Sequence, residues 1–359
     1  MTLEVALTVL FAIAIGVIAY LTVQLNRAGR ALPDAPLHAA PAPPIPPPVA
    51  EAIIGIQEKV SYRGASVGLI PVPEMVGTPG GLRPVEPAGL PGGHDVVPDS
   101  VVDGANLGSL TVRAASVRGD HHRQEPNFRR DAYTIQPLTG GFAVPNLVSV
   151  VAAGNPNGSV AQTGAALACR SVVTQLGKLG GSIDAAWNGQ PSIDLRELLR
   201  PVCNGVANRL TELAQSRQVP EAESSVELVC LVSQLGDTSE RRHLAFGIGG
   251  GVVLRCTDQG WQLVFSAQEG PGKPEVLPGG HQALRVGMVE SRPDDILLVA
   301  SQATAQVVTS RDSGAFFAGQ WRQGPRDLVE FLWQFSARTP GTARDRTAVC
   351  LWDSGRALT

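Results

Sequence analysis

The residues best placed for chemistry surround a turn between a predicted strand and a predicted helix. The β-branched residues Val148, Val150 and Val151 precede the turn-forming residues 154–158. Apolar residues spaced by three and four then run from Ala161 to Leu179, which predicts a helix that Ser159 could cap. An enzyme could mount a metal ligand or a phosphate site on such a turn. Here the turn carries Ala153 and Gly154 and no acid.

Other residues offer weaker alternatives. The pair His121 and His122 could bind a metal or a phosphate, but no third ligand is spaced to join them, so a solvated loop is favoured. The GIGGG sequence at 247–251 could cradle a phosphate. It lacks the following helix and the lysine of a P-loop, which favours a tight hairpin. Asp294 and Asp295 precede a core strand and are typical of a turn.

Composition excludes several classes of function. The 359 residues carry a net charge of −3, which gives no reason to expect nucleic-acid binding. The five cysteines are widely spaced and form no C-x-x-C, so neither a zinc site nor a disulfide framework is indicated. We expect buried, reduced thiols.

The N-terminal residues predict a membrane anchor. Val5 to Val23 is apolar, uncharged and long enough to cross a bilayer as a helix. A cleaved signal peptide is the alternative, but Glu4 makes the preceding region acidic and the apolar run is long. Arg27 and Arg30 follow the run, which predicts a single-pass cell-membrane protein with a cytoplasmic C-terminal domain.

A spacer separates this anchor from the main domain. Residues 31–50 are dominated by proline and alanine and favour extended polyproline II. Residues 52–76 contain a few apolar positions that could pack on the domain, and 77–100 look irregular. The predicted organisation is an anchor over 1–30, a Pro/Gly-rich linker over 31–100 and one folded domain over 101–359.

The sequence of the predicted domain, 101–359, indicates strands and helices that are grouped along the chain. Predicted strands cover 110–117, 131–135, 225–234, 244–248, 252–256, 261–265, 296–300 and 347–352, and predicted helices cover 192–215, a stretch near 303 and 325–335. Pro201 should kink or restart the second helical region. The strand over 225–234 is apolar on both faces and is therefore central, and three strands from 244 to 265 suggest an antiparallel meander. The grouping indicates two antiparallel sheets with helices outside.

Five short sequences in this order resemble the metal-dependent type 2C protein phosphatases, the PPM family, and in particular its bacterial members. The resemblance covers Val101 to Asp353 and rests on ASVRG at 115–119 with His122-Arg123 and RRDAY at 129–133, on VAAG at 151–154, on GIGGG at 247–251, on DDILLVASQA at 294–303 and on RDRTAVCLW at 344–352. It implies an α+β fold, an α-β-β-α sandwich of two antiparallel sheets flanked by helices. In this family two Mn²⁺ or Mg²⁺ ions activate the water that attacks a phosphoserine or phosphothreonine.

The metal positions that the resemblance implies are largely lost. The bridging acid is replaced by Ala153, and two further acids are replaced by Gly250 and Gln302. Asp131, the Gly154 carbonyl and Asp345 are the residual metal candidates. Arg130 replaces another acid and Asn155 stands where some members place a general-acid histidine. Arg130, Arg344 and Arg346 would add positive charge near the site, and Arg123 is the candidate phosphate-binding residue.

The sequence therefore predicts a pseudophosphatase, with no catalytic residue and no cofactor expected. Such a module would bind or regulate phosphoproteins, or a Ser/Thr kinase or phosphatase pathway, at the membrane, and would not bind nucleic acid. The alternative is a weak Mn²⁺- or Mg²⁺-dependent phosphatase that recruits other acids, such as Asp120, Glu125 or Asp258.

Overall fold

The fold was analysed in a computed structural model, which describes residues 76, 88–92, 96–138, 141–187, 193–236, 240–339 and 343–355. The chain divides into two units, Met1–Leu69 and Ile70–Thr359, and every described residue belongs to the second. The predicted anchor (5–23) and spacer (31–50) lie outside the described residues. Within the described ranges, no helix combines the length and the apolarity that a membrane span needs.

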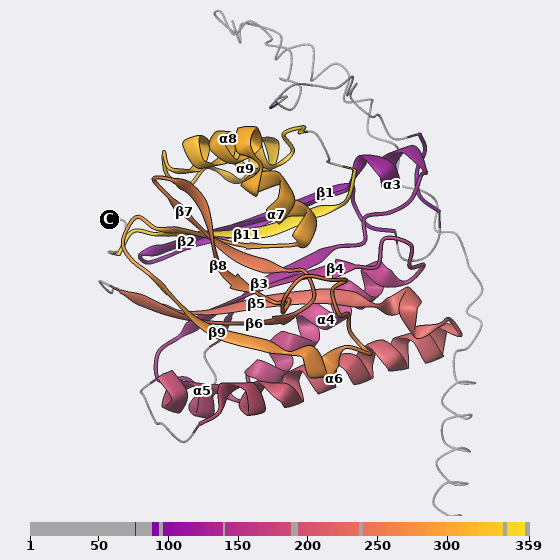
Figure 1. Cartoon of the computed structure of the whole chain (residues 1–359), viewed down its shortest axis with the longest axis horizontal. Helices are drawn as coiled ribbons and strands as arrows, with labels where there is room; N and C mark the ends of the chain where they lie inside the picture. Colours follow the sequence, from indigo (N-terminus) through magenta and orange to yellow (C-terminus); the bar gives the residue numbers. More distant parts are fainter. Residues whose placement is uncertain are drawn as a thin grey trace, which may run out of the picture. The chain divides into compact units, whose positions relative to one another are not determined.

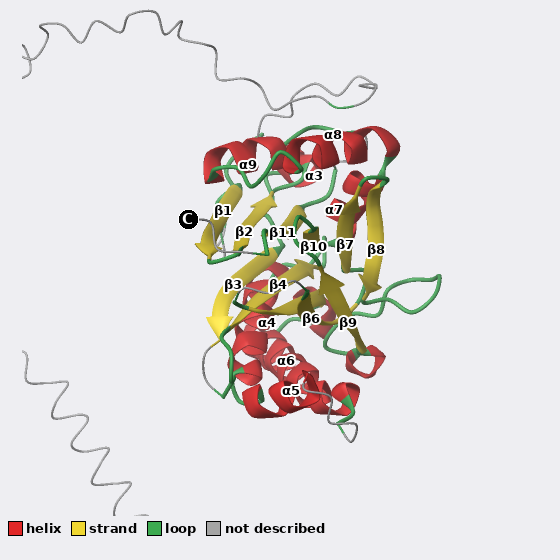
Figure 2. Ribbon diagram, turned by 90° about the vertical axis from the view of Figure 1, so that its left-hand side faces the viewer, coloured by secondary structure: helices red, strands yellow, loops and turns green. Residues whose placement is uncertain are grey.

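Two antiparallel sheets stack face to face (Figures 1 and 2). The six-stranded sheet has the order β1 (Ser100–Leu107), β2 (Leu110–Val117), β11 (Arg346–Asp353), β10 (Ile296–Ala300), β7 (Val252–Thr257) and β8 (Gly260–Ser266). The five-stranded sheet has the order β3 (Ala132–Leu138), β4 (Asn146–Gly154), β5 (Val226–Gln234), β6 (Arg241–Ile248) and β9 (Arg285–Ser291). β5 is central in its sheet, as its continuous apolar sequence predicts.

Helices cover the outer face of each sheet (Figure 1). The five-stranded sheet is covered by α4 (Ala161–Leu176), α5 (Gly180–Trp187) and α6 (Leu195–Arg217). The six-stranded sheet is covered by α7 (Gln302–Thr309), α8 (Arg311–Trp321) and α9 (Leu328–Phe335). The predicted pair of antiparallel sheets flanked by helices is therefore what the structure contains. A short helix, α3 (Asp120–Gln124), lies at one end of the sandwich.

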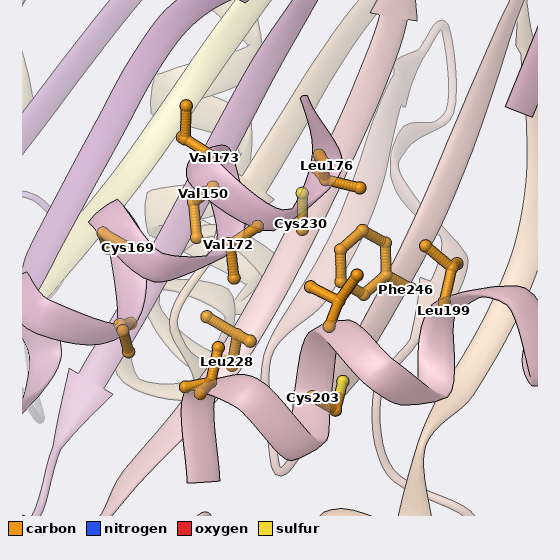
Figure 3. Close-up of a cluster of buried hydrophobic side chains, with 14 of the residues drawn as sticks. Val150, Cys169, Val172, Val173, Leu176, Leu199, Cys203, Leu228, Cys230 and Phe246 are labelled. Carbon is orange, nitrogen blue, oxygen red and sulfur yellow. The ribbon is translucent and has the colours of Figure 1, made fainter. Parts of the chain in front are cut away.

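Three apolar layers hold these elements together. One fills the space between the sheets, with Val112, Val151, Leu231 and Val349 among its members. A second lies under α7 to α9 and centres on Trp321 and its aromatic neighbours. The third lies between the five-stranded sheet and α4 and α6, where β4, β5 and β6 meet the two helices (Figure 3).

All five cysteines are buried and free, as expected from their apolar surroundings. Three of them, Cys169, Cys203 and Cys230, belong to the layer shown in Figure 3. Burial raises the pKa of each of these thiols, to about 12 for Cys169 and Cys203. A thiol with so high a pKa is neither a nucleophile nor a metal ligand at neutral pH, so these three cysteines serve packing.

The predicted meander is correct only for β7 and β8, which pair antiparallel, and the predicted GIGGG hairpin is wrong. β6 belongs to the five-stranded sheet and β7 to the six-stranded sheet, so residues 249–251 carry the chain from one sheet to the other. Gly249 has a φ of +104°, and a Cβ on Gly251 would lie 2.7 Å from a methyl group of Val229. These glycines are needed because the backbone turns sharply while it touches the other sheet.

Other local predictions also needed correction. α6 continues through Pro201, which is exposed, so the predicted restart of the helix is absent. The N-cap of α4 is Val160 rather than Ser159. The strand β9 and the helix α8 were missed, because neither has a long apolar run with a clear period. Asp294 and Asp295 do form a turn, in which Asp295 Oδ2 accepts a hydrogen bond from the Arg292 N–H at 2.8 Å.

The folded part of the chain extends N-terminal to the predicted boundary at residue 101. β1 begins at Ser100, and Asp99 before it accepts hydrogen bonds from two arginines. Val76 packs on the aromatic layer, and its N–H donates to the Arg338 carbonyl at 2.9 Å. Of the segment 52–76, only Val76 is among the described residues, and it does contact the domain.

Candidate functional site

The predicted site residues converge on one hollow at the end of the sandwich where β4 finishes and β11 starts. This hollow, called the cleft below, has a volume of about 440 Å³ including its open mouth. Its lining is His121, His122, Asp131, Ala153, Gly154, Pro156, Glu227, Ser301, Gln302, Ala303, Ala343, Arg344 and Asp345. Gly250 adjoins it, because a Cβ on Gly250 would lie 2.9 Å from Cδ of Gln302. Residues more than 200 positions apart in the sequence therefore meet here.

Asp345 is held entirely by the protein. Its Oδ1 accepts a hydrogen bond from the Gly119 N–H at 2.7 Å and lies 2.9 Å from Nδ1 of His122. Its Oδ2 accepts from the Arg130 N–H at 2.7 Å. Asp345 is buried, so these donors replace the water that the carboxylate has lost. A divalent cation would have to compete with the two N–H donors and with His122 for this carboxylate.

His122 connects the cleft to the turn after β4. Its Nδ1 faces Asp345 and its Nε2 lies 3.2 Å from the Pro156 carbonyl oxygen, so both ring nitrogens face acceptors. The side chain is buried on α3 and is not the solvated loop residue that the sequence favoured. His121 is exposed and lies 3.5 Å from Glu125. The two histidines therefore have different roles, and His122 is structural.

Asp131 is the opposite of Asp345 in its environment. It is buried, and its Oδ2 has no hydrogen-bond partner among the described residues. Burial, followed by repulsion from the Asp345 carboxylate, raises the pKa of Asp131 to about 8. Asp131 therefore keeps its proton at neutral pH, and an orphaned polar atom faces the cleft.

Glu227 is an acid of the cleft that the sequence prediction missed. It lies on β5 directly opposite Ala153 on β4, so a carboxyl group stands beside the position that the resemblance equates with the family's bridging acid. Its Oε2 accepts a hydrogen bond from the Gly250 N–H at 3.0 Å, and burial raises its pKa. The available signal was a single acid within the apolar strand sequence VELVCLV.

Gly154 and Gly250 are fixed by close packing. A Cβ on Gly154 would lie 2.6 Å from the Arg130 carbonyl oxygen, and one on Gly250 would lie 3.0 Å from Oε2 of Glu227. Contacts under 3.0 Å are not tolerated without movement of the backbone, so Gly154 cannot carry a side chain in this fold. An acid at position 250 would likewise have to displace Glu227 or Gln302.

Of the arginines expected near the site, only Arg344 lines the cleft. It is exposed, and its Nη1 donates to Oε1 of Gln302 at 3.5 Å. Arg130 turns away and donates to the Gly158 carbonyl at 3.0 Å. Arg346 is buried and donates to the Ala337 carbonyl at 2.9 Å.

Arg123, the phosphate-binding candidate, does not line the cleft. Its Nη2 and Nε donate to the two carboxylate oxygens of Asp99 at 2.6 and 3.0 Å. Arg118 also donates a hydrogen bond to Asp99, at 2.7 Å. Arg338 donates one to the Asp120 carboxylate at 2.8 Å. This group, called the Asp99 clamp below, fixes α3 against the start of β1. α3 in turn presents His122 to Asp345.

The other acids considered as recruits are also elsewhere. Asp120 belongs to the ion pairs of α3, Glu125 faces His121 on the exposed side, and Asp258 is 98% exposed beside Arg322. Asn155 borders the adjoining hollow, where its side chain donates to the Ala222 carbonyl at 2.8 Å. None of these four side chains is part of the cleft lining.

The cleft does not fit a pair of divalent cations. Hard cations need several carboxylate oxygens that converge on one point. Asp345 has its oxygens taken by protein donors, and Glu227 accepts a hydrogen bond from the Gly250 N–H. Over the described part of the chain, no three histidine, cysteine, aspartate or glutamate side chains are grouped so that they could hold a metal.

The sequence matches no protein-family model and no curated protein. Solved structures of similar fold include a bacterial serine phosphatase, at 12% identity over 69% of this chain and 99% of that chain, with a TM-score of 0.46. A serine/threonine phosphatase of S. agalactiae is 12% identical over 70% of this chain and 99% of that chain, with a TM-score of 0.42. The SpoIIE phosphatase domain of Bacillus subtilis, with a fragment of its regulatory domain, is 12% identical over 70% of this chain and 68% of that chain, also with a TM-score of 0.42.

Proposed function

We propose that the protein is a pseudophosphatase, a PPM-like module that binds or regulates phosphoproteins or a Ser/Thr kinase or phosphatase pathway without catalysis. The hydrogen bonding of Asp345 carries the proposal. The acid at this retained position accepts from the Gly119 and Arg130 N–H groups and contacts His122, so it works as an internal anchor of α3 and of the β4–α4 turn.

A further part of the proposal concerns location. The uncharged run from Val5 to Val23, followed by Arg27 and Arg30, supports a single-pass anchor with the folded domain in the cytoplasm. Free cysteines throughout the described domain are compatible with a reducing compartment. A membrane position would bring the module close to membrane-bound kinases or their substrates.

Metal titration of the full-length chain tests the central claim. We expect Mn²⁺ to bind only in the millimolar range, about −4 kcal/mol, and no Mn²⁺-dependent hydrolysis of p-nitrophenyl phosphate or of phosphothreonine peptides. The double substitution Ala153→Asp and Gln302→Asp should raise the metal affinity measurably, because position 153 faces Glu227 and position 302 lies on the cleft wall formed by the start of α7. Ala303→Asp is the matched control, since it adds an acid to the same wall at a position with no ligand role in the family.

Two results would change the conclusion. Hydrolysis of a phosphopeptide by the unmodified chain, with loss of that activity in Asp345→Ala, would favour the alternative of a weak metal-dependent phosphatase. Equal metal binding by the Ala303→Asp control and the double variant would show that positions 153 and 302 are not ligand positions. The weak-enzyme alternative has one supporting feature, the placement of Glu227 beside Ala153.

A further inference from the structure

Arginines gather where α3 meets the segment that follows α9, away from the cleft lining. Four of them interact there, namely Arg118, Arg123, Arg338 and Arg346. Asp99 pairs with Arg118 and Arg123 at 2.7 and 2.6 Å. Asp120 pairs with Arg123 and Arg338 at 3.4 and 2.8 Å. Four guanidinium groups therefore share two carboxylates.

The two arginines that follow α9 in the sequence are incompletely satisfied. Arg338 is buried, and its Nε has no hydrogen-bond partner among the described residues. Arg346 is also buried, and within the described ranges its side chain donates one hydrogen bond, to the Ala337 carbonyl at 2.9 Å, and forms no ion pair. Burial lowers the pKa of Arg346 to about 10, and the nearby Arg123 and Arg338 add to this shift although Asp120 opposes it. Because buried cations are costly without a counter-charge, this place favours one more carboxylate.

The chain itself passes this place just before the domain begins. The Val76 N–H donates to the Arg338 carbonyl at 2.9 Å, and the Val76 side chain packs on the aromatic layer. The Ala88 N–H donates to the carbonyl of Arg123 on α3, also at 2.9 Å. Glu74 comes two residues before Val76, so its Cα lies within about 7 Å of that of Val76. The unit that contains the domain begins at Ile70, which assigns Glu74 to the same unit.

We propose that residues 70–75, with the sequence IPVPEM, dock on this junction and that the Glu74 carboxylate binds the guanidinium groups of Arg338 and Arg346. Pro71 and Pro73 favour an extended backbone, so the segment loses little conformational entropy when it docks. Residues two apart in an extended chain share a face. Since Val76 faces the domain, Glu74 faces it as well. A carboxylate bound by two guanidinium groups is among the stronger polar contacts of proteins.

This docking concerns how the domain is attached to the sequence before it, and it goes beyond the proposed function. It ends the free linker at residue 69 instead of residue 100. It also joins the linker to the cleft, because Arg338 pairs with Asp120 on α3 and the same helix presents His122 to Asp345.

The experiment measures how fast a maleimide labels a cysteine introduced at Val72 in the full-length chain. All five native cysteines are buried and give only a slow background. Val72→Cys should react about tenfold more slowly than Ala40→Cys, a position in the spacer that also precedes a proline. Adding Glu74→Gln should restore most of that tenfold, as expected for loss of a charge-assisted hydrogen bond. Rates for the same variants in denaturant correct for the effect of the Glu74 charge on the thiol.

Two further acids serve as controls in the Val72→Cys background. Glu58→Gln removes an acid of the same N-terminal region that is far in sequence from Val76, and it should leave the labelling rate unchanged. Glu86→Gln removes the acid two residues before Ala88, which is the competing partner for these arginines, and it should also have no effect. Circular dichroism of each variant separates loss of fold from loss of docking.

Four outcomes would overturn the inference. Val72→Cys and Ala40→Cys could react equally fast, or Glu74→Gln could leave the rate unchanged. Glu86→Gln could accelerate labelling as much as Glu74→Gln, which would assign the missing carboxylate to Glu86. Protection that disappears on dilution would show that the segment docks on a second copy of the chain.

Discussion

Strand β11 ends at the buried Asp353 and is directly preceded by the buried Asp345, and the two sites differ in how completely their polar atoms are hydrogen-bonded. At the far end, Asp353 accepts hydrogen bonds from Nε and Nη2 of Arg241 at 2.9 and 3.1 Å. It also accepts one from the Ser291 hydroxyl at 2.8 Å. At the cleft end, Asp345 is equally well held, but Asp131 beside it has an unpartnered oxygen. One end is built for stability, whereas the other keeps an unsatisfied group where a ligand could bind.

The far end forms a continuous polar network between the two sheets. Arg241 also donates to the Ser109 hydroxyl at 2.8 Å and to the Gln234 carbonyl. His243 lies between the hydroxyls of Ser233 and Ser291, at 2.8 and 2.9 Å. Strands β5, β6, β9 and β11 are thereby joined through side chains as well as through their ladders.

The largest expected effect comes from breaking this network. Asp353→Ala should lower the free energy of unfolding by about 3–5 kcal/mol, because it leaves the fully buried Arg241 without its counter-charge. Chemical denaturation of the full-length chain measures this change. Glu212→Ala is the control, since Glu212 pairs with Arg209 on an exposed helix surface and its loss should hardly matter. Similar values for both variants would contradict the assigned role of Asp353.

The two ends should respond to pH in opposite directions. Burial lowers the pKa of His243 to about 3, so the unfolded chain binds more protons below pH 6.5 and the far end loses stability as the pH falls from 6.5 towards 3. The pKa of Asp131 is raised to about 8, so the folded chain binds more protons above pH 4 and the cleft end loses stability as the pH rises from 4 towards 8.

Two single variants separate these contributions. Asp131→Asn should reduce the loss of stability between pH 5 and pH 8 by about 1–3 kcal/mol. His243→Gln should reduce the loss between pH 6.5 and pH 4 by a similar amount, although its stability at pH 7 will be lower. Denaturation midpoints across pH 4 to 8 give both quantities. A profile for Asp131→Asn that is parallel to wild type would show that Asp131 is ionised in the fold.

The smallest expected effect concerns the Asp99 clamp. Asp99→Asn should cost about 1 kcal/mol, because Arg118 and Arg123 lose a carboxylate that is itself partly exposed to solvent. The pairing with Arg123 lowers the pKa of Asp99 to about 2, although burial opposes the shift, so this contribution is present above pH 4 and is lost as the pH falls towards 2. Asp103→Asn is a suitable control on the exposed side of β1. Equal stability of both variants at pH 7 would show that the clamp contributes nothing.

Local patterns predicted most of the layers of the fold but not the crossings between them. Strand β10 and strand β5 were predictable because ILLVA is apolar throughout and VELVCLV is apolar except for Glu227. The passage from β6 to β7 was not, because GIGGG permits either a hairpin or a change of sheet, and only the packing against Val229 and Gln302 distinguishes them. β9 was missed because its exposed edge position leaves few apolar residues in its sequence.

In the candidate site too, local patterns did not predict which distant residues meet. The resemblance predicted that Ala153, Gly250 and Gln302 belong to one site, and the structure brings these positions together. The partners of the remaining acids could not be read, because His122 lies 223 residues from Asp345. Arg241 similarly lies 112 residues from Asp353. Glu227 required the register of β4 against β5, which no local pattern provides.

The position of β11 has a consequence for how the domain folds. This strand lies in the interior of the six-stranded sheet, where it pairs with β2 from the opening part of the domain and with β10. The β1–β2 hairpin and the β10–β7–β8 group therefore remain separate until residues near 350 are available to join them. Since such non-local pairing closes a large loop before its contacts form, we expect the assembly of this sheet to be a late step during synthesis. Until that step, the inner edges of β2 and β10 are open, and a growing chain is then most exposed to mispairing with another copy.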